Sequence, residues 1–164
     1  MRRRAGSPAA LKMKTSARSR RHRLSRFGLA AVGALVVAAL PVPVAAATTL
    51  YVDINNSSCS DSGPGSQAQP YCHIQAAAKV ATAGTTVSVA SGTYSEDVTP
   101  ANSGASGSPI TFMAAPSASV TITGQANGFT LSNVSWITVQ RFTVTGTSRA
   151  GIYASGASNL VIAA

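Results

Sequence analysis

GFTLSNVSWITV (residues 128–139) and GIYASGASNLVI (residues 151–162) decide the fold of this 164-residue chain, because they align without a gap at an offset of 23 residues. The alignment pairs turn residues with turn residues and apolar residues with apolar residues: Gly128 with Gly151, Phe129 with Ile152, Ser132 with Ser155, Ser135 with Ser158 and Ile137 with Leu160. Recurrence at one spacing is typical of a solenoid, in which each strand pairs with the equivalent strand one coil later. The repeat therefore predicts a parallel β-helix.

Short β-rich runs make up the rest of the chain after Gly84, and Gly, Ser or Asn separates most of them. Apart from an opening strand at 50–52, the expected strands are 86–90, 110–114, 120–123, 129–131, 136–139, 142–145, 152–154 and 160–162. A β-sandwich is the alternative architecture, but its equivalent strands have no reason to recur at one spacing. The predicted fold class is an all-β solenoid, with residues 85–164 forming the first coils of a parallel β-helix.

One helix is predicted between Pro70 and Gly84. Its apolar residues fall at positions i, i+3, i+4 and i+7: Ile74, Ala77, Ala78 and Ala81. A short Ala-rich helix needs its apolar face covered by other parts of the protein, and the first coil of a solenoid has an open apolar end. We expect residues 48–84 to form an opening strand, a disulfide loop and a helix that caps this end.

The other end of the chain has no such cap. Ala164 follows the last apolar run by two residues, without a charged or helical segment. Solenoids need terminal caps and about three repeats for stability. We therefore expect the sequence to be the front of a longer protein, truncated within its first coils.

The first 47 residues have the pattern of an export signal. Ten of the 13 Lys and Arg residues lie in the first 26 positions, the apolar run 27–40 follows, and Ala45–Ala47 offers a cleavage site. The run is shorter than the ~20 residues that a spanning helix needs, which disfavours a membrane anchor. Residues 19–24 (SRRHRL) resemble a twin-arginine signal except at Arg23, so the twin-arginine and general secretory routes both stay open. We predict a secreted, extracellular protein that leaves the membrane once the signal peptide is cleaved.

The formal charge of +9 belongs to this leader. From Thr48 onward, three cations and four anions leave a net charge of −1. Non-specific binding of nucleic acid requires the neutralisation of several phosphates. We therefore exclude nucleic acid as a partner of the mature chain.

Cys59 and Cys72 are the two cysteines of the chain, and both lie in its mature part. In an oxidising compartment such a pair is most simply a disulfide. A zinc site is the alternative, but only His73 is adjacent and a fourth ligand is missing. We predict the Cys59–Cys72 bridge.

Several segments carry a resemblance to a known family: Leu50–Asp53, Ser60–Ser66, Gln69–Tyr71, Ile74–Ala77, Gly84–Val89 and Gly92–Tyr94 with Glu96. With the later coils, residues 50–164 resemble the N-terminal region of secreted right-handed parallel β-helix proteins of the pectate-lyase-like superfamily. This opening is shared by polysaccharide lyases, epimerases, glycosidases and uncharacterised surface proteins. The resemblance therefore implies a fold and leaves the activity open.

What the resemblance implies for function is an exported enzyme acting on an acidic extracellular polysaccharide, either a uronate lyase or a glycoside hydrolase. Uronate lyases use a Lys or Arg base, and commonly Ca²⁺ held by Asp and Glu oxygens. Residues 48–164 contain no matching cluster, so we assign no catalytic residue, cofactor-binding residue or metal ligand. We expect the catalytic coils beyond residue 164, and Ca²⁺ is a cofactor by resemblance only. A non-catalytic carbohydrate-binding or surface β-helix is the alternative.

Individual polar and aromatic residues give weaker indications. Trp136 and Arg141 are candidate sugar contacts, although a packing role for Trp136 and a turn position for Arg141 are the competing interpretations. Glu96 and Asp97 form the one adjacent carboxylate pair, which we interpret as solvated turn residues rather than Ca²⁺ ligands. We expect Lys79 and Arg149 to be solvated side chains of the surface. We expect His73 to belong to the start of the helix.

Overall fold

The computed structural model describes residues 47–164. The predicted signal peptide, residues 1–47, lies outside the described residues except for its last position. Within the part that is described, no helix is both long and apolar enough to cross a lipid bilayer.

Ten short strands and one helix make up the described chain. The strands are Thr48–Val52 (β1), Thr85–Val89 (β2), Gly92–Tyr94 (β3), Ile110–Ala114 (β4), Val120–Ile122 (β5), Asn127–Ser132 (β6), Ser135–Gln140 (β7), Thr143–Val144 (β8), Ala150–Ser155 (β9) and Ser158–Ala163 (β10), and the helix is Ile74–Val80 (α1). β3 was not among the strands expected from the sequence, because Gly92 and Thr93 give its three residues no apolar run.

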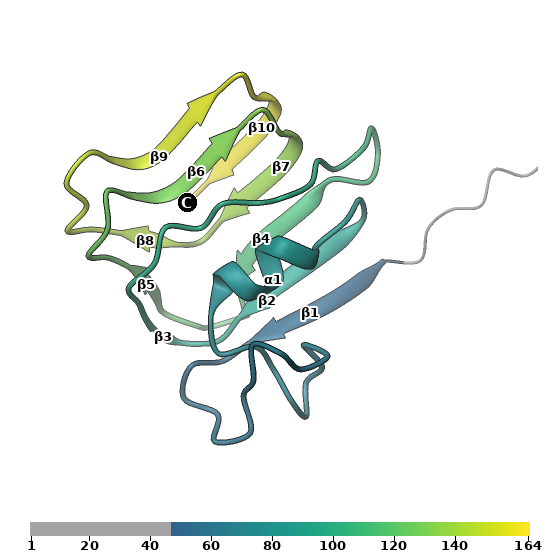
Figure 1. Ribbon diagram of the computed structural model, residues 1–164, viewed down its shortest axis with the longest axis vertical. Coiled ribbons are helices and arrows are strands. Elements are labelled where there is room, and N and C mark those ends of the chain that lie inside the picture. The colour runs from purple at the N-terminus through teal and green to yellow at the C-terminus, as the bar shows by residue number, and fades with distance from the viewer. Residues whose placement is uncertain (1–46) are drawn as a thin grey trace, which may run out of the picture. The chain divides into compact units, whose positions relative to one another are not determined.

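The strands form three parallel sheets, and two coils of the chain, β4-β5-β6 and β7-β8-β9, pass through all three in turn (Figure 1). The largest sheet has the order β1-β2-β4-β7-β10, the second β3-β5-β8 and the third β6-β9. Every pairing between these strands is parallel. A β-sandwich has antiparallel sheets, so that alternative is wrong and the predicted parallel β-helix is confirmed.

Strand register confirms the repeat found in the sequence. In the largest sheet Ile137 pairs with Leu160, and in the third sheet Phe129 pairs with Ile152, each at the predicted offset of 23 residues. Earlier coils are longer: Val87 pairs with Phe112, and Phe112 with Val139, at offsets of 25 and 27 residues. Turns of unequal length between well-matched strands explain why only one coil pair aligns without a gap.

The core lies inside the coils, where alternate residues of β2, β4 and β5 are buried. β2 and β4 both alternate buried and half-buried residues, with Val87, Phe112 and Ile137 fully buried. The rings of Phe112 and Phe129, from one coil, and of Phe142, from the next, pack edge to face with centroid separations of 5.8 and 5.4 Å. This period-two pattern places the remaining side chains of the largest sheet on its outer surface.

Helix α1 closes the N-terminal end of the coils, as predicted. All four residues of its predicted apolar stripe are fully buried, although Ala81 follows the last helical residue: Ile74, Ala77, Ala78 and Ala81. The helix contacts β1 and β2, and the carbonyl oxygen of Ala78 accepts a hydrogen bond from Ala101 N at 3.2 Å. It therefore shields the interior of the first coil from solvent.

Candidate functional site

The outer surface of the largest sheet, which we call the outer face, carries uncharged polar side chains in register. Two columns run across the strands: Thr49, Thr86, Thr111 and Thr138, and beside them Tyr51, Ser88, Met113 and Gln140. Neighbouring members of a column are about 4.8 Å apart, the spacing of paired strands. On β1, β2, β4 and β7 the face is thus a ladder of mostly hydroxyl groups, with Met113 as its apolar member and Tyr51 as its aromatic one, and on β10 the columns continue as Val161 and Ala163.

A pocket of about 300 Å³ opens on this face at the carboxyl ends of β1, β2 and β4. We call it the sheet-corner pocket. Its polar lining consists of a phenol, a carboxylate, two amides and a hydroxyl, and its apolar lining of small residues and prolines: Tyr51, Asp53, Asn56, Gln67 and Ser88, with Val52, Pro70, Ala90, Ala115 and Pro116. Few convergent polar groups on a mostly apolar wall are typical of small-molecule sites.

The disulfide loop forms one wall of this pocket by returning alongside β1. Tyr51 N donates to Gly65 O at 2.8 Å, and Tyr71 N donates to Tyr51 O at 2.9 Å, on the edge of β1 that faces away from β2. Gly65 has a φ of +64°, and a Cβ at this position would collide with the Tyr71 ring. Glycine is therefore required where the loop turns back and brings Gln67 to the pocket.

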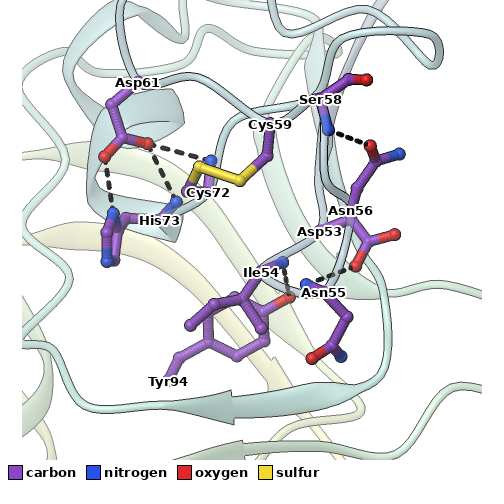
Figure 2. Close-up of a disulfide and its surroundings, with 10 residues drawn as sticks. All are labelled: Asp53, Ile54, Asn55, Asn56, Ser58, Cys59, Asp61, Cys72, His73 and Tyr94. Carbon is purple, nitrogen blue, oxygen red and sulfur yellow. Dashed lines mark hydrogen bonds and ion pairs between the residues drawn. A yellow bond between two sulfur atoms is a disulfide. The ribbon is translucent and has the colours of Figure 1, made fainter.

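Local hydrogen bonds fix Asp53 and Asn56, two further residues of the pocket lining (Figure 2). Asp53 Oδ1 accepts from Asn55 N at 3.0 Å, and Asn56 Oδ1 accepts from Ser58 N at 2.8 Å. The Asn55 amide donates to Ser91 O at 2.9 Å, which ties this turn to the turn after β2. Among residues 47–164, Asp53 Oδ2 and the Asn56 amide nitrogen have no hydrogen-bond partner, so both can bind a ligand.

The predicted disulfide is present and lies behind this loop. Cys59 and Cys72 are bonded, with their Cα atoms 5.0 Å apart. Because both sulfur atoms are used in the bridge, the alternative of a Cys–Cys–His zinc site is wrong. In Figure 2 the bridge separates Asp53 and Asn56 on one side from Asp61 and His73 on the other.

Asp61 and His73 form a hydrogen-bonded pair on that second side. Asp61 Oδ2 lies 2.5 Å from His73 Nδ1, and Asp61 Oδ1 accepts from the backbone N–H groups of Cys72 and His73 at 2.9 and 3.0 Å. Partial burial acts to raise the pKa of Asp61, but the hydrogen bonds from the His73 side chain and the two amides outweigh it and lower that pKa. His73 directly precedes α1, as expected from the sequence.

Glu96 is buried, so its interpretation as a solvated turn residue is wrong. Its two carboxylate oxygens accept from Ile74 N at 2.9 Å and Gln75 N at 2.7 Å, the first free amides of α1. Burial raises the pKa of Glu96, and the two backbone hydrogen bonds offset only part of that effect. The turn after β3 lies against the start of the helix. No pattern within either segment predicts this contact, because it joins parts of the chain that are distant in sequence.

Asp97 points away from Glu96, as adjacent residues on an extended chain do. It accepts a hydrogen bond from Thr130 Oγ1 at 2.8 Å, on the third sheet. Glu96 therefore serves the helix and Asp97 serves β6, and the two carboxylates do not meet in one ligand site.

A second pocket, of about 390 Å³, lies beside the start of α1. It is lined by residues of the helix and of the two segments that bind it: Asp61, His73, Gln75, Ala76, Lys79, Val80 and Glu96. The carboxylates in it already accept backbone hydrogen bonds. The carboxylates of this pocket therefore hold the start of the helix, and their hydrogen-bonding oxygens are largely occupied by backbone amides.

The residues predicted as sugar contacts lie outside both pockets. Trp136 is half-buried in β7, with a φ of +58°, and Arg141 is exposed in the following turn, with a φ of +63°. Their role in sugar binding stays a prediction. Arg149 is exposed and lies 4.2 Å above the Tyr153 ring, and Lys79 is exposed on α1.

Sequence reasoning missed the polar residues of the sheet-corner pocket. Tyr51 and Asp53 do alternate with the inward-facing Leu50 and Val52, and this alternation was the one available signal. Asn56 and Gln67 come from a loop without periodicity, so only the fold brings them to β1.

Comparisons with known proteins agree with the architecture. Residues 57–101 match a family described as protein of unknown function (DUF1565). The chain is 38% identical over 77 residues to the uncharacterized protein YwoF of Bacillus subtilis (strain 168), covering 47% of this chain and 16% of that protein. A rhamnogalacturonan lyase structure matches with a TM-score of 0.50 and 22% identity, over 59% of this chain and 28% of the lyase. The complex of XylC with xylose matches with a TM-score of 0.44 and 36% identity, over 47% of this chain and 12% of XylC.

These matches cover much less than two thirds of each related protein. The likeness to rhamnogalacturonan lyase, together with the three parallel sheets, shows a parallel β-helix fold. The resemblance stated from the sequence is thus confirmed as a fold. That the chain is the front of a longer protein stays a prediction.

Proposed function

We propose that these coils bind polysaccharide, with one sugar unit in the sheet-corner pocket and the neighbouring units along the outer face. The observation that carries the proposal is the set of unpaired polar groups around Tyr51: Asp53 Oδ2, the Asn56 amide nitrogen, and the Gln67 and Ser88 side chains. A sugar ring carries hydroxyl groups around its edge and C–H groups on its faces. The lining offers hydrogen-bonding side chains for the hydroxyl groups and the Tyr51 ring for a C–H face.

The size and placement of the pocket support this proposal. A volume of about 300 Å³ lies at the lower end of the range for small-molecule pockets, which suits a single sugar ring. The ladder of Thr86, Thr111 and Thr138 continues from it across the sheet. A linear glycan could therefore occupy the pocket with one unit and hydrogen-bond the hydroxyl groups beyond it.

The solved structure that shares this fold supports a polysaccharide as the class of ligand. It is described as a rhamnogalacturonan lyase, an enzyme of polysaccharides. Residues 47–164 contain no group of three His, Cys, Asp or Glu side chains able to hold a metal ion. Glycan binding is what we propose for the described coils, whichever reaction the whole protein performs.

We also propose that the protein acts outside the cytoplasm. The export-signal pattern of residues 1–47 supports this, and so does the Cys59–Cys72 bridge, because such bridges persist in oxidising compartments. An exported glycan-binding protein meets its ligand where polysaccharides are exposed.

Tyr51→Ala in the full chain tests the binding site. We expect this variant to lose at least about tenfold in affinity for the glycans that the unaltered chain binds, because a ring contact and a phenol hydroxyl are removed together. Isothermal titration calorimetry against a panel of soluble oligosaccharides measures the loss. Tyr153→Ala is the matched control, since Tyr153 is a half-buried tyrosine on β9, in the third sheet. Equal losses in the two variants, or no binding by the unaltered chain, would exclude this site.

A further inference from the structure

The charge of the outer face bears on which glycans it can hold. The side chains in its two columns, from Thr49 to Gln140, are all uncharged. Among the ten residues that line the sheet-corner pocket, Asp53 is the charged one. Any ligand in the pocket therefore meets a carboxylate that has no cation beside it in the lining.

The cations of the described chain lie elsewhere. Lys79 is on α1 and Arg149 stacks over Tyr153 before β9. Arg141 is nearer, in the turn at the carboxyl end of β7, one strand position from the β4 side of the pocket and three strand positions from β1, the strand that Asp53 follows. Three spacings amount to about 14 Å, more than the ~8 Å over which exposed charges interact at physiological ionic strength.

We propose that the sheet-corner pocket selects a neutral sugar unit and rejects a uronate. This inference rests on the proposed glycan binding and names its substrate class. Asp53 Oδ2 accepts a hydrogen bond from a sugar hydroxyl, and the Asn56 amide donates one to a sugar oxygen. A uronate carboxylate in the same place lacks a hydroxyl hydrogen to donate to Asp53, and like charges repel in a partly desolvated pocket.

This selectivity runs against the acidic substrate that the sequence resemblance implies. The resemblance covers the coil architecture and the N-terminal cap, whereas the ligand preference depends on the side chains that line this pocket. Asp53 belongs to the Leu50–Asp53 segment that carries the resemblance, and yet its carboxylate is what disfavours an acidic ligand.

The test compares neutral and acidic ligands of equal length on the full chain. Hexasaccharides of xylose, glucose, mannose and galactose serve as neutral probes, and a hexasaccharide of galacturonic acid serves as the acidic probe. Calorimetric titrations are run with and without added Ca²⁺, because a bridging cation could conceal the repulsion. We expect at least one neutral probe to bind about tenfold or more tightly than the acidic probe without Ca²⁺, and this ratio of affinities to shrink where Ca²⁺ bridges the two carboxylates.

Asp53→Asn isolates the charge with little change of shape. We expect this variant to bind the acidic probe more tightly, while its affinity for the neutral probe changes less. The ratio of neutral to acidic affinity should therefore fall severalfold. Asp97→Asn is the matched control, since it removes the same charge from the segment after β3, where Asp97 accepts a hydrogen bond from Thr130, and it should keep the full selectivity. Without Ca²⁺, acidic binding equal to or stronger than neutral binding, or selectivity unchanged in Asp53→Asn, overturns this inference alone. If no probe of either kind binds, the proposed glycan binding falls as well.

Discussion

Four consecutive backbone amides at the start of α1 are bound by just two side chains. Asp61 accepts the N–H groups of Cys72 and His73, and Glu96 accepts those of Ile74 and Gln75. Neither carboxylate belongs to the helix, and its N-cap residue, His73, makes no side-chain capping bond. The helix start is therefore held by the disulfide loop on one side and by the turn after β3 on the other.

Replacing Glu96 by Ala should destabilise the fold by about 2–4 kcal/mol, because two amides lose charged acceptors and one of them is buried. Glu96→Gln keeps one good acceptor and should cost about half as much. Urea unfolding followed by circular dichroism measures both changes. Lys79→Ala, on the exposed side of the same helix, should stay within about 0.5 kcal/mol of the unaltered chain. A change for Glu96→Ala as small as this control would contradict the capping role.

Glu96 also makes a specific contribution to the pH dependence of stability. Since burial raises the pKa of this carboxyl in the folded state, the folded chain holds the proton more tightly than the unfolded chain. This contribution to the free energy of unfolding is therefore largest below about pH 4.3, the ordinary pKa of a glutamate in the unfolded chain. It falls as the pH rises through the raised pKa of Glu96 in the folded chain. Asp61, with its lowered pKa, contributes the opposite slope at lower pH. Comparing unfolding curves of the unaltered chain and Glu96→Gln across pH should show the Glu96 slope only in the former.

Secondary-structure elements were predictable where their pattern is local. The apolar stripe of α1 and the strand 110–114 both lie where the sequence placed them, because periodicity within one element reports its buried face. The coil lengths were predictable only for the last pair, since the longer turns of earlier coils hide their repeat. Glu96 and Gln67 were missed because their contacts join segments about 15 to 22 residues apart.

The capping role of α1 predicts that charge on its buried face opens the end of the coils. Ala78 is fully buried, so Ala78→Asp would bury an unpaired carboxylate or displace the helix. We expect aggregation at concentrations where the unaltered chain stays soluble, measured by light scattering, since an uncovered coil end exposes strand edges. Val80→Asp adds the same charge two residues further on, at a position that is 52% exposed, and should leave solubility unchanged. Equal light scattering by the two variants would mean that α1 does not protect the N-terminal end of the coils from aggregation.

At the scale of the whole molecule, one loop connects the glycan pocket with the N-terminal cap. Asn56 and Gln67 of this loop line the sheet-corner pocket, whereas Asp61 of the same loop binds the start of α1. The Cys59–Cys72 bridge lies between these two functions and closes the loop across a sequence separation of 13 residues. Stability of the cap and affinity for the ligand should therefore depend on the same covalent link.

Replacing both cysteines by serine should affect both properties together. Loss of a loop closure of this length costs about 3 kcal/mol on the chain-entropy model, because the unfolded chain gains freedom. Glycan affinity should also fall, since the loop that carries Asn56 and Gln67 then lacks its covalent closure and is held by hydrogen bonds, among them those of Gly65, Ser60 and Asp61. Urea unfolding and calorimetric titration of the same preparation measure the two effects, and a thiol assay on the unfolded, unreduced parent should find no free thiol. Lowered stability with unchanged affinity would show that the bridge supports the cap alone, and that the pocket wall is fixed by its own hydrogen bonds to β1.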